Sequence, residues 1–422
     1  MKRRQVVIVG AGFGGLWAAQ SLAKAGDPHP VAVRLLDQHN YHTFLPLLYQ
    51  VAAAELEPGL IAQSVRSLLR GRRNVRFTMA TVERIDLAAQ RVYGSGQTFA
   101  YDTLILALGS VNHFFGVPGA AEHCFTLKTV EEGLILRNHI LRCVERAAAL
   151  APGEEAARRS LLTFVIIGGG PTGVEYAGAL AELLRHPLHK DYPELDLRDT
   201  AQVVLLEAAD QLLQGVGGGD YARTRLESMG VQVRVQSKVA AITAEAVILD
   251  GGEQIATTAA VWTAGVTGAP LAEELPLERV RGGRIPVSPT LQTLTHDNVF
   301  VIGDLAYLEQ DGKMLPGVAQ VAMQQGEHAA ANIARQARGE PLLPFRYRDK
   351  GAMATIGRNA AVAQIGRLRL TGFTAWLAWL AVHIFFLIGF RNRLGVLLAW
   401  AWNYVFYERA VRLILPNGTP DT

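Results

Sequence analysis

The sequence contains the same short pattern twice. Residues 5–26 (QVVIVGAGFGGLWAAQSLAKAG) and residues 163–184 (TFVIIGGGPTGVEYAGALAELL) each start with a run of β-branched residues, continue through a glycine-rich turn and end in an alanine-rich stretch. These parts predict a buried strand, a tight turn and a helix. Two such units in one chain predict an α/β fold with two domains of the same Rossmann-like kind.

The first glycine turn has the spacing of a dinucleotide-binding loop. Gly10, Gly12 and Gly15 form GxGxxG directly after the expected strand and at the start of the expected helix. The first glycine allows the turn, the second lets the backbone approach a diphosphate, and the third lets the helix pack on the strand. Asp37 ends the next expected strand, 22 residues past Gly15, where a carboxylate accepts hydrogen bonds from a ribose diol.

The second turn repeats this arrangement with Gly168, Gly170 and Gly173. The expected strand that follows ends in Glu207, 34 residues past Gly173, and the polar stretch 186–199 accounts for a spacing longer than the usual ~20. An acid at this position favours NAD over NADP, because a carboxylate repels a 2′-phosphate. The alternative is that Glu207 is a surface charge at the end of a strand.

Two dinucleotide sites in one chain predict two cofactors that exchange electrons, and FAD with NAD(P)H is the obvious pair. A third apolar run, 298–304 (NVFVIGD), ends in Gly303 and Asp304. We expect the Gly303 amide near the flavin diphosphate and the Asp304 carboxylate on the ribityl hydroxyls. A helix N-cap is the alternative role for Asp304.

The cysteines restrict what the electrons reduce. The chain has two, Cys124 and Cys143, which are 19 residues apart. A disulfide-reducing flavoenzyme needs two close cysteines, commonly in a CxxC or CxxxxC motif. Disulfide reduction and sulfide oxidation are therefore disfavoured, and packing is the expected role of both thiols. No metal-ligand spacing occurs either, so we expect no metal.

Composition excludes some other classes. The formal net charge is only +3 and basic residues are scattered, so nucleic-acid binding is not expected. The first apolar run is too short for a signal peptide, and the chain is expected to begin as mature cytoplasmic protein. The expected domains are an FAD-binding domain (1–120 and 285–345), an inserted NADH-binding domain (121–284) and a C-terminal region (346–422).

The C-terminal region is unusually apolar. Residues 370–390 contain no Asp, Glu, Lys or Arg, and Arg391 and Arg393 follow them. A second uncharged stretch covers 394–407, and the two stretches together hold four of the six tryptophans. Tryptophan clustering beside arginines is typical of helices that lie in a membrane interface. The first stretch is just long enough to span a bilayer, but its polar residues and glycines favour a monotopic anchor over a span.

At this point the chain resembles a known family, the type II NADH:quinone oxidoreductases, which are single-chain, non-pumping NADH dehydrogenases. The resemblance covers nearly the whole sequence. It rests on the two glycine turns and on these segments: NYHTFLPLLYQVA at 40–52, TVEEGLILRNHIL at 129–141, VWTAGV at 261–266, AQVAMQQG at 319–326 and KGAMATIGRNAAVA at 350–363.

The resemblance implies a set of site residues. Catalytic roles fall to Glu175, which would hydrogen-bond the nicotinamide or relay a proton, and to Gln320 and Gln324, which would orient a quinone through neutral amides. The alternative for the two glutamines is that they are ordinary polar residues on one face of an amphipathic helix. The alternative for Glu175 is that a carboxylate in the first turns of a helix is favoured by the helix macrodipole alone. Lys350 matches the pattern, but no role is assigned to it. The implied FAD residues are Gly10, Gly12, Phe13, Gly14, Gly15, Asp37, Thr43, Val82, Ala107, Gly109, Gly303, Asp304, Ala319 and Gln320. The implied NADH residues are Gly168, Gly170, Pro171, Thr172, Gly173, Glu175, Glu207, Ala264 and Gly265.

The sequence thus predicts an enzyme that takes a hydride from NADH onto non-covalent FAD and passes two electrons to a membrane quinone, ubiquinone or menaquinone, without proton pumping. The expected location is the cytoplasmic side of the inner membrane, and homodimerisation is left open. Two alternatives remain. One is a flavin reductase with a soluble, ferredoxin-like acceptor, and the other is a flavin-binding redox sensor with little turnover.

Overall fold

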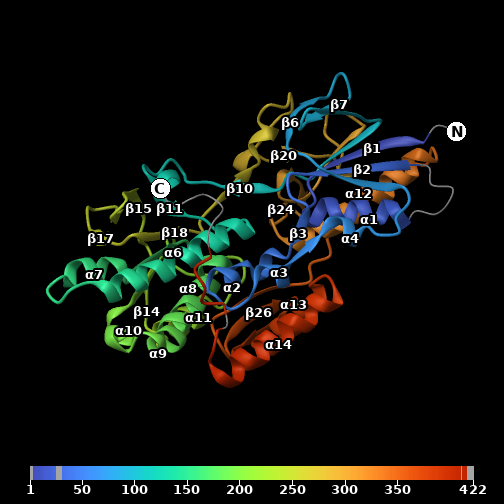
Figure 1. Cartoon of the computed structure of the whole chain (residues 1–422). Coiled ribbons are helices and arrows are strands. Elements are labelled where there is room, and N and C mark those ends of the chain that lie inside the picture. Colours follow the sequence, from blue (N-terminus) through green and yellow to red (C-terminus); the bar gives the residue numbers. More distant parts are fainter. Residues whose placement is uncertain (1–2, 25–30, 410, 416–422) are drawn as a thin grey trace. The chain divides into compact units, whose positions relative to one another are not determined.

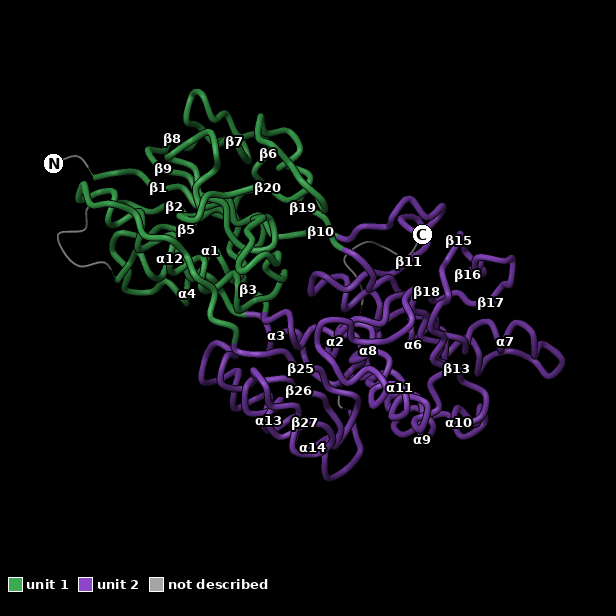
Figure 2. The backbone as a smooth tube through the Cα atoms, turned by 180° about the vertical axis from the view of Figure 1, so that it is seen from behind, with its two compact units in different colours: residues 1–43, 63–111, 266–349 green, residues 44–62, 112–265, 350–422 purple. Residues whose placement is uncertain are grey.

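The computed structural model describes residues 3–24, 31–409 and 411–415 (Figure 1). The chain divides into two compact units, each assembled from three separate segments (Figure 2). The first unit contains residues 1–43, 63–111 and 266–349, and the second contains residues 44–62, 112–265 and 350–422. Residues 416–422 of the predicted C-terminal region lie outside the described residues.

A five-stranded parallel sheet forms the centre of the first unit. Its order is β21-β9-β1-β2-β5, and the strands are β1 (Arg4–Val9), β2 (Val31–Asp37), β5 (Val75–Met79), β9 (Thr103–Leu106) and β21 (Val299–Val301). The β-branched residues of β1 are buried on both faces of the sheet, as expected for a parallel sheet covered by helices. Strand β21 comes from the third apolar run of the sequence and pairs with β9.

Two helices of the first unit cross closely beside this sheet (Figure 1). They are α1 (Phe13–Lys24), which follows β1, and α12 (Ala319–Ala337). A Cβ atom at Gly326 would lie only 2.3 Å from the Gly14 carbonyl oxygen, so this crossing requires glycine on α12. The other elements are β3 (Tyr41–Thr43), β4 (Ala62–Ser64), α4 (Val65–Leu68), β6 (Val82–Asp86), β7 (Arg91–Gly94), β8 (Gln97–Ala100), β10 (Ser110–Asn112), β19 (Val266–Gly268), η4 (Pro270–Ala272), η5 (Arg281–Gly283), β20 (Ile285–Pro286), η6 (Gly303–Leu305), β22 (Ala306–Tyr307), β23 (Glu309–Gln310) and β24 (Lys313–Met314).

The second unit has its own five-stranded parallel sheet. Its order is β11-β18-β12-β13-β14, and the strands are β11 (Cys124–Phe125), β12 (Thr163–Ile167), β13 (Gln202–Leu206), β14 (Val231–Arg234) and β18 (Ala259–Trp262). Helix α8 (Pro171–Leu183) follows β12, as the repeated pattern predicted. Helix α6 (Val130–Ala149) starts at a capping box in which Thr129 and Glu132 each bond the other's backbone amide. The other elements are η1 (Leu45–Leu47), α2 (Leu48–Ala52), α3 (Pro58–Ile61), α5 (Ala120–His123), α7 (Glu155–Leu161), η2 (Leu184–Leu188), α9 (His189–Asp191), η3 (Pro193–Leu195), α10 (Leu197–Thr200), α11 (Gly219–Ser228), β15 (Val239–Ile242), β16 (Ala246–Leu249) and β17 (Gln254–Ala256).

The C-terminal region belongs to the second unit. An antiparallel sheet of β25 (Ala352–Thr355), β26 (Ala361–Ile365) and β27 (Leu368–Thr371) is followed by α13 (Gly372–Phe386) and α14 (Phe390–Phe406). Helix α13 packs on the sheet, and α14 packs on α3 (Figure 1). Among the described residues, no helix combines the length and the apolar character needed to cross a membrane. The predicted α/β class with two Rossmann-like sheets and C-terminal helices is therefore confirmed.

Candidate functional site

The first glycine turn has the geometry that its spacing predicted. Gly10 has a φ of +102°, and a Cβ atom there would lie 2.2 Å from the Ala107 carbonyl oxygen. A Cβ atom at Gly15 would lie 1.8 Å from the Gly10 carbonyl oxygen, so the strand and the helix meet without room for a side chain. Nothing lies within 4 Å of the corresponding position at Gly12. This open space at the start of α1 fits a diphosphate that approaches the backbone.

Asp37 closes this turn from the end of β2. Its Oδ2 accepts a hydrogen bond from the Ala11 amide at 2.6 Å, and its Oδ1 accepts one from the His39 amide at 2.8 Å. Burial raises the pKa of the Asp37 carboxyl, while these two hydrogen bonds oppose the rise. A carboxylate has about four acceptor positions, so two remain for a ribose diol.

The second turn reproduces these contacts. Gly168 has a φ of +115°, a Cβ atom at Gly173 would lie 1.9 Å from the Gly168 carbonyl oxygen, and nothing lies within 4 Å of that position at Gly170. Glu207 Oε2 accepts from the Gly169 amide at 2.6 Å, and its Oε1 accepts from the Ala209 amide at 2.8 Å. Glu207 therefore occupies the position that Asp37 has in the first unit.

The long spacing before Glu207 has the predicted cause. The extra residues form η2, α9, η3 and α10, which lie between α8 and β13. Pro171 is the first residue of α8 and, with Thr172, is exposed at the start of that helix. Ala264 lies next to Gly168, because a Cβ atom at Gly168 would be 2.8 Å from the Ala264 amide nitrogen. Gly265 follows with a φ of +71°. The predicted NADH residues at the ends of β12 and β18 thus lie together.

The remaining predicted FAD residues lie on several elements of the first unit. Ala107 and Gly109 follow β9, and Gly303 and Asp304 follow β21 in η6. Thr43 ends β3, Val82 starts β6, Ala319 starts α12, and Phe13 and Gly14 start α1. Asp304 Oδ2 accepts a hydrogen bond from the Ser110 hydroxyl at 2.7 Å. The Gly303 amide donates to the Gln325 side-chain oxygen at 2.7 Å, so its predicted bond to a diphosphate would require it to change partner.

The glutamines of α12 differ in their surroundings. Gln324 pairs with the backbone of Arg348, because its amide donates to the Arg348 carbonyl and accepts from the Arg348 amide, both at 3.0 Å. Gln320 Oε1 is buried and has no hydrogen-bond partner among the described residues. Gln325, which the sequence analysis did not single out, is buried and holds the Gly303 amide. Gln320 is therefore the predicted glutamine whose polar group remains available.

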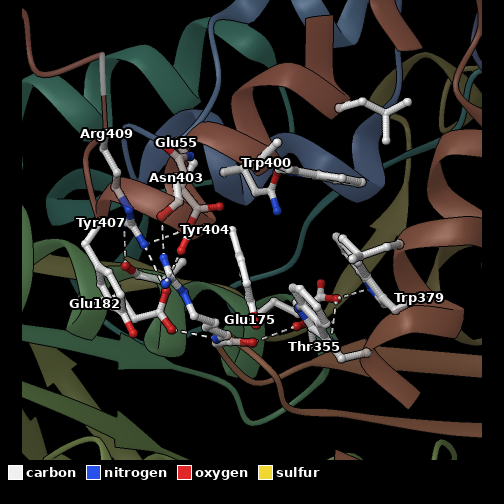
Figure 3. A pocket seen from close by; sticks show the side chains of 18 of the residues that line it. Glu55, Glu175, Glu182, Thr355, Trp379, Trp400, Asn403, Tyr404, Tyr407 and Arg409 are labelled. Atoms are coloured by element: carbon white, nitrogen blue, oxygen red, sulfur yellow. Dashed lines mark hydrogen bonds and ion pairs between the residues drawn. The ribbon is translucent and has the colours of Figure 1, made fainter. Parts of the chain in front are cut away.

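Glu175 lies in α8 with its carboxyl group buried (Figure 3). Its Oε1 accepts hydrogen bonds from the Thr355 amide at 3.2 Å and from the Trp379 indole nitrogen at 3.3 Å. Burial raises the pKa of the Glu175 carboxyl to about 8, and the two hydrogen bonds oppose this rise. Both donors bind Oε1, which leaves Oε2 as the oxygen that carries the proton. An acid of this pKa exchanges its proton near neutral pH.

Glu175 lines a cavity of about 690 Å³ between α2, α8, α13 and α14 (Figure 3). Its walls are mainly apolar and aromatic and include Trp379, Trp400 and Tyr404. The Trp400 indole nitrogen donates to the Gln50 side-chain oxygen at 2.9 Å. Such a cavity, apolar with a few polar groups, is the usual form of a small-molecule site. Sequence reasoning assigned the four C-terminal tryptophans to a membrane interface and did not predict that three of them, Trp376, Trp379 and Trp400, line the cavity that contains Glu175.

A buried ion cluster lies at another part of the same cavity (Figure 3). Arg409 Nη2 lies 2.6 Å from Glu55 Oε1 and 3.3 Å from Glu182 Oε2. Its Nη1 donates to the carbonyl oxygens of Ala53 and Ala179 at 2.8 and 2.7 Å. Burial raises the pKa of Glu55 to about 7, and the charge of Arg409 opposes that rise. The cluster connects the segment after α14 to the turn after α2 and to α8, and no sequence motif indicated it.

Lys350 and the cysteines complete the predicted residues. The Lys350 ammonium lies 5.3 Å from the centre of the Phe386 ring, a cation–π contact. Cys124 and Cys143 are free thiols in β11 and α6. Burial raises the pKa of Cys124 to about 12 and raises that of Cys143 as well, so neither forms a reactive thiolate at neutral pH. Both therefore suit the packing role that was predicted.

Known proteins are similar to this chain in sequence and in fold. Residues 4–326 match the family model described as pyridine nucleotide-disulphide oxidoreductase. The type II NADH:quinone oxidoreductases Ndh and NdhA of Mycobacterium tuberculosis are 38% and 39% identical to the chain, over 97% and 96% of its length and 89% and 87% of theirs. The chain belongs to the type II NADH:quinone oxidoreductase family. This membership confirms the resemblance drawn from the sequence motifs and the predicted class of enzyme, a flavoprotein NADH:quinone oxidoreductase.

Solved structures agree with the fold of a type II NADH:quinone oxidoreductase. The structure of NDH2 from Plasmodium falciparum in complex with NADH has a TM-score of 0.87 and covers 98% of this chain and 100% of its own, at 16% identity. The sulfide:quinone oxidoreductase of Aquifex aeolicus has a TM-score of 0.72 and covers 96% of each chain, at 19% identity. At these identities the likeness concerns the fold alone.

Proposed function

We propose that this chain oxidises NADH through non-covalently bound FAD and delivers two electrons to a membrane quinone, without pumping protons. FAD, when bound, supplies the chemistry that accepts a hydride and passes on an electron pair. The protein's own residues bind and orient the reactants, exclude water and supply protons. Family membership supports the reaction. The residues described above support the roles that we assign to each of the two units.

The first unit is the proposed FAD-binding part. Its glycine turn leaves open space only at Gly12, where the backbone would approach the diphosphate. Asp37 would receive the ribose hydroxyls, and Asp304, held by Ser110, would receive the ribityl hydroxyls. The predicted domain limits of 1–120 and 285–345 remain a proposal for the segments that hold FAD.

The second unit is the proposed NADH-binding part, and residues 121–284 remain the proposed limits of that domain. Gly170 offers the open space for the diphosphate, and Glu207 would bind the adenosine ribose. A 2′-phosphate at this place would meet a carboxylate of the same sign of charge. We therefore propose that NADH is preferred over NADPH.

The observation that carries the quinone assignment is the aromatic cavity that contains the buried Glu175 carboxyl. Quinone reduction takes up two protons, and an acid with a pKa of about 8 is mostly protonated at neutral pH and can donate one. The apolar walls suit the quinone ring and its hydrocarbon tail. Gln320 of the first unit stays a proposed quinone contact on the family pattern, because its side-chain oxygen has no partner among the described residues, whereas Gln324 would first have to release the Arg348 backbone.

Membrane attachment fits a lipid-soluble acceptor. Large apolar side chains on α13 and α14 are exposed, among them Phe385 (69%), Phe390 (82%) and Leu398 (63%). Exposed apolar faces on paired helices are typical of elements that lie in one leaflet of a membrane. We propose a monotopic anchor at the cytoplasmic face of the inner membrane, with Arg391 and Arg393 near the headgroups.

The test is anaerobic rapid mixing of the full-length protein in detergent, with flavin absorbance as the signal. NADH should bleach the flavin faster than NADPH does, and ubiquinone or menaquinone should then restore the absorbance. A soluble-acceptor reductase would fail in the second step, and a redox sensor with little turnover would be slow in the first. Either result would overturn the proposal.

A further inference from the structure

Four arginines line a second pocket in the second unit. It has a volume of about 550 Å³, and four guanidinium groups line it. They are Arg185 of η2, Arg198 of α10, Arg225 of α11 and Arg358 of the turn between β25 and β26. Among the lining residues that the structure describes, Glu182 is the one carboxylate. The pocket therefore carries a strong excess of positive charge.

These positive charges are not neutralised by the protein. Glu182 is already bonded to Arg409 and to the Arg358 amide. In the described part of the chain, none of the four arginines forms an ion pair with a carboxylate. They donate instead to main-chain carbonyl oxygens, namely those of Gly230 (from Arg185), Arg185 (from Arg198), Arg358 (from Arg225) and Tyr404 and Asn403 (from Arg358). The Nε of Arg225 is buried and has no hydrogen-bond partner among the described residues.

The pocket lies next to the apolar C-terminal helices. It shares Glu182, His186, Arg358 and Tyr407 with the cavity beneath α13 and α14. Arg358 holds the end of α14, because its guanidinium donates to carbonyls of that helix and lies 3.6 Å from the centre of the Tyr407 ring. The last turns of α14 expose large side chains, including Trp402 (51%), Val405 (65%) and Phe406 (50%).

Guanidinium groups bind phosphate oxygens in bidentate geometry, and several of them around one pocket select an anion with more than one oxygen. A basic pocket beside an exposed apolar helix is the arrangement that receives the headgroup of an anionic lipid while its acyl chains follow the helix. A free phosphate compound offers the same anionic group but no apolar part. The exposed end of α14 favours the lipid.

We propose that this arginine pocket binds the phosphate group of an anionic phospholipid at the end of α14. The inference rests on the membrane attachment in the proposed function and adds a preference for lipid charge to it. The occupant would be held by Arg185, Arg198, Arg225 and Arg358, and its acyl chains would contact the exposed side chains of α14.

The experiment is flotation of the full-length protein with vesicles of phosphatidylcholine alone or mixed with phosphatidylglycerol. The double variant Arg198→Gln/Arg225→Gln tests the pocket. The matched control Arg159→Gln/Arg223→Gln removes the same charge from exposed positions of the second unit outside the pocket. Each arginine that is replaced should lower the affinity for the anionic vesicles about five-fold, so the double variant should bind them about 25-fold more weakly than the wild type.

Folding and activity are controlled separately. Retained flavin and unchanged NADH oxidation with a short-chain quinone in detergent would show that the double variant is intact. Arg225 also holds the Arg358 carbonyl, so the single variant Arg198→Gln provides the result if the double variant unfolds. Arg198 is exposed and, among the described residues, its side chain bonds the Arg185 carbonyl alone, so its loss should leave the fold unchanged.

The results separate the two proposals. A preference for anionic vesicles that is lost in the pocket variants and kept in the control supports the inference. Equal binding to both kinds of vesicle, or an unchanged preference in the pocket variants, overturns it and leaves membrane attachment standing. Failure to bind any vesicle overturns the attachment itself.

A second measurement distinguishes a lipid headgroup from a free phosphate compound. It is calorimetric titration of the protein in detergent with inorganic pyrophosphate. If pyrophosphate binds tightly and the pocket variants lose this binding, while the protein shows no preference for anionic vesicles, the ligand of the pocket is a free phosphate compound and the lipid proposal is overturned.

Discussion

The indole nitrogen of Trp379 lies 3.3 Å from Oε1 of Glu175 and donates a hydrogen bond to it, although the two residues are 204 positions apart. This contact joins a C-terminal helix, α13, to the helix that follows the second glycine turn, α8. Both side chains are buried and both line the aromatic cavity. The same tryptophan therefore forms a wall of the proposed quinone site and lowers the pKa of its proposed proton donor, against the larger rise that burial causes.

Trp379→Phe should raise the pKa of Glu175 further, because the indole hydrogen bond stabilises the carboxylate and lowers this pKa. The rate of flavin reoxidation by quinone should then keep its low-pH value to a higher pH than in the wild type. The measurement is the pH profile of that rate. Trp402→Phe, at an exposed position of α14, should leave the profile unchanged, and a downward shift in Trp379→Phe would contradict this account.

Glu175 should also make stability depend on pH. Its pKa in the folded state, about 8, exceeds the ordinary value of 4.5, so the folded protein binds the proton more tightly than the unfolded chain. The contribution of this proton to the free energy of unfolding is fully present below about pH 4.5 and is lost as the pH rises through about 8. Within that range the free energy of unfolding falls by up to ~1.4 kcal/mol per pH unit. Glu175→Gln should remove this slope.

Denaturant unfolding of the wild type and of Glu175→Gln across this pH range would measure the difference. The variant should gain stability relative to the wild type as the pH rises. Glu55, with a pKa raised to about 7, adds a slope of the same sign to both proteins and therefore cancels in the comparison. A constant difference at every pH would show that Glu175 titrates normally.

Arg409→Ala should destabilise the protein by about 3–5 kcal/mol, because it leaves Glu55 and Glu182 without their partner in a largely buried site. Arg412→Ala is the matched control, since Arg412 lies three residues further along and pairs with Asp191 at a more exposed position. That loss should cost about 0–1 kcal/mol. Chemical unfolding at neutral pH measures both values, and equal effects would contradict the structural importance of the buried cluster.

Gly12→Ala and Gly15→Ala should fail in different ways. A Cβ atom at Gly12 meets nothing within 4 Å, so the variant should fold with nearly unchanged stability and bind FAD weakly. A Cβ atom at Gly15 would lie 1.8 Å from the Gly10 carbonyl oxygen, so that variant should lose stability outright. Thermal unfolding without added FAD and the flavin content after purification distinguish them. Full flavin content in Gly12→Ala would refute the assigned cofactor position.

Short-range patterns made much of the fold predictable. A β-branched run, a glycine turn and an alanine-rich run lie within some twenty residues, so their order and spacing are enough to predict a strand, a turn and a helix. The positions of Asp37 and Glu207 at strand ends followed from the same patterns, and both carboxylates bond the turn beside them. The two apolar C-terminal stretches form the helices α13 and α14.

Contacts between distant segments could not be predicted in this way. No spacing rule indicates that Trp379 meets Glu175 or that Arg409 meets Glu55, because these contacts depend on how helices from different segments pack. Gln324 shows the same limit. It matched the family pattern, yet its amide is paired with the Arg348 backbone, while the adjacent Gln325 holds Gly303. The four arginines of the second pocket likewise come from separate places in the sequence, namely η2, α10, α11 and the turn between β25 and β26.

The central claim is that Glu175 supplies a proton to a quinone in the aromatic cavity, and flavin reoxidation in Glu175→Gln tests it most directly. The control is Glu245→Gln, at an exposed position of the second unit. After anaerobic reduction by NADH, quinone should reoxidise the flavin of Glu175→Gln at least ten-fold more slowly than that of the wild type and of the control. Reoxidation at the wild-type rate with the wild-type pH dependence would contradict the claim.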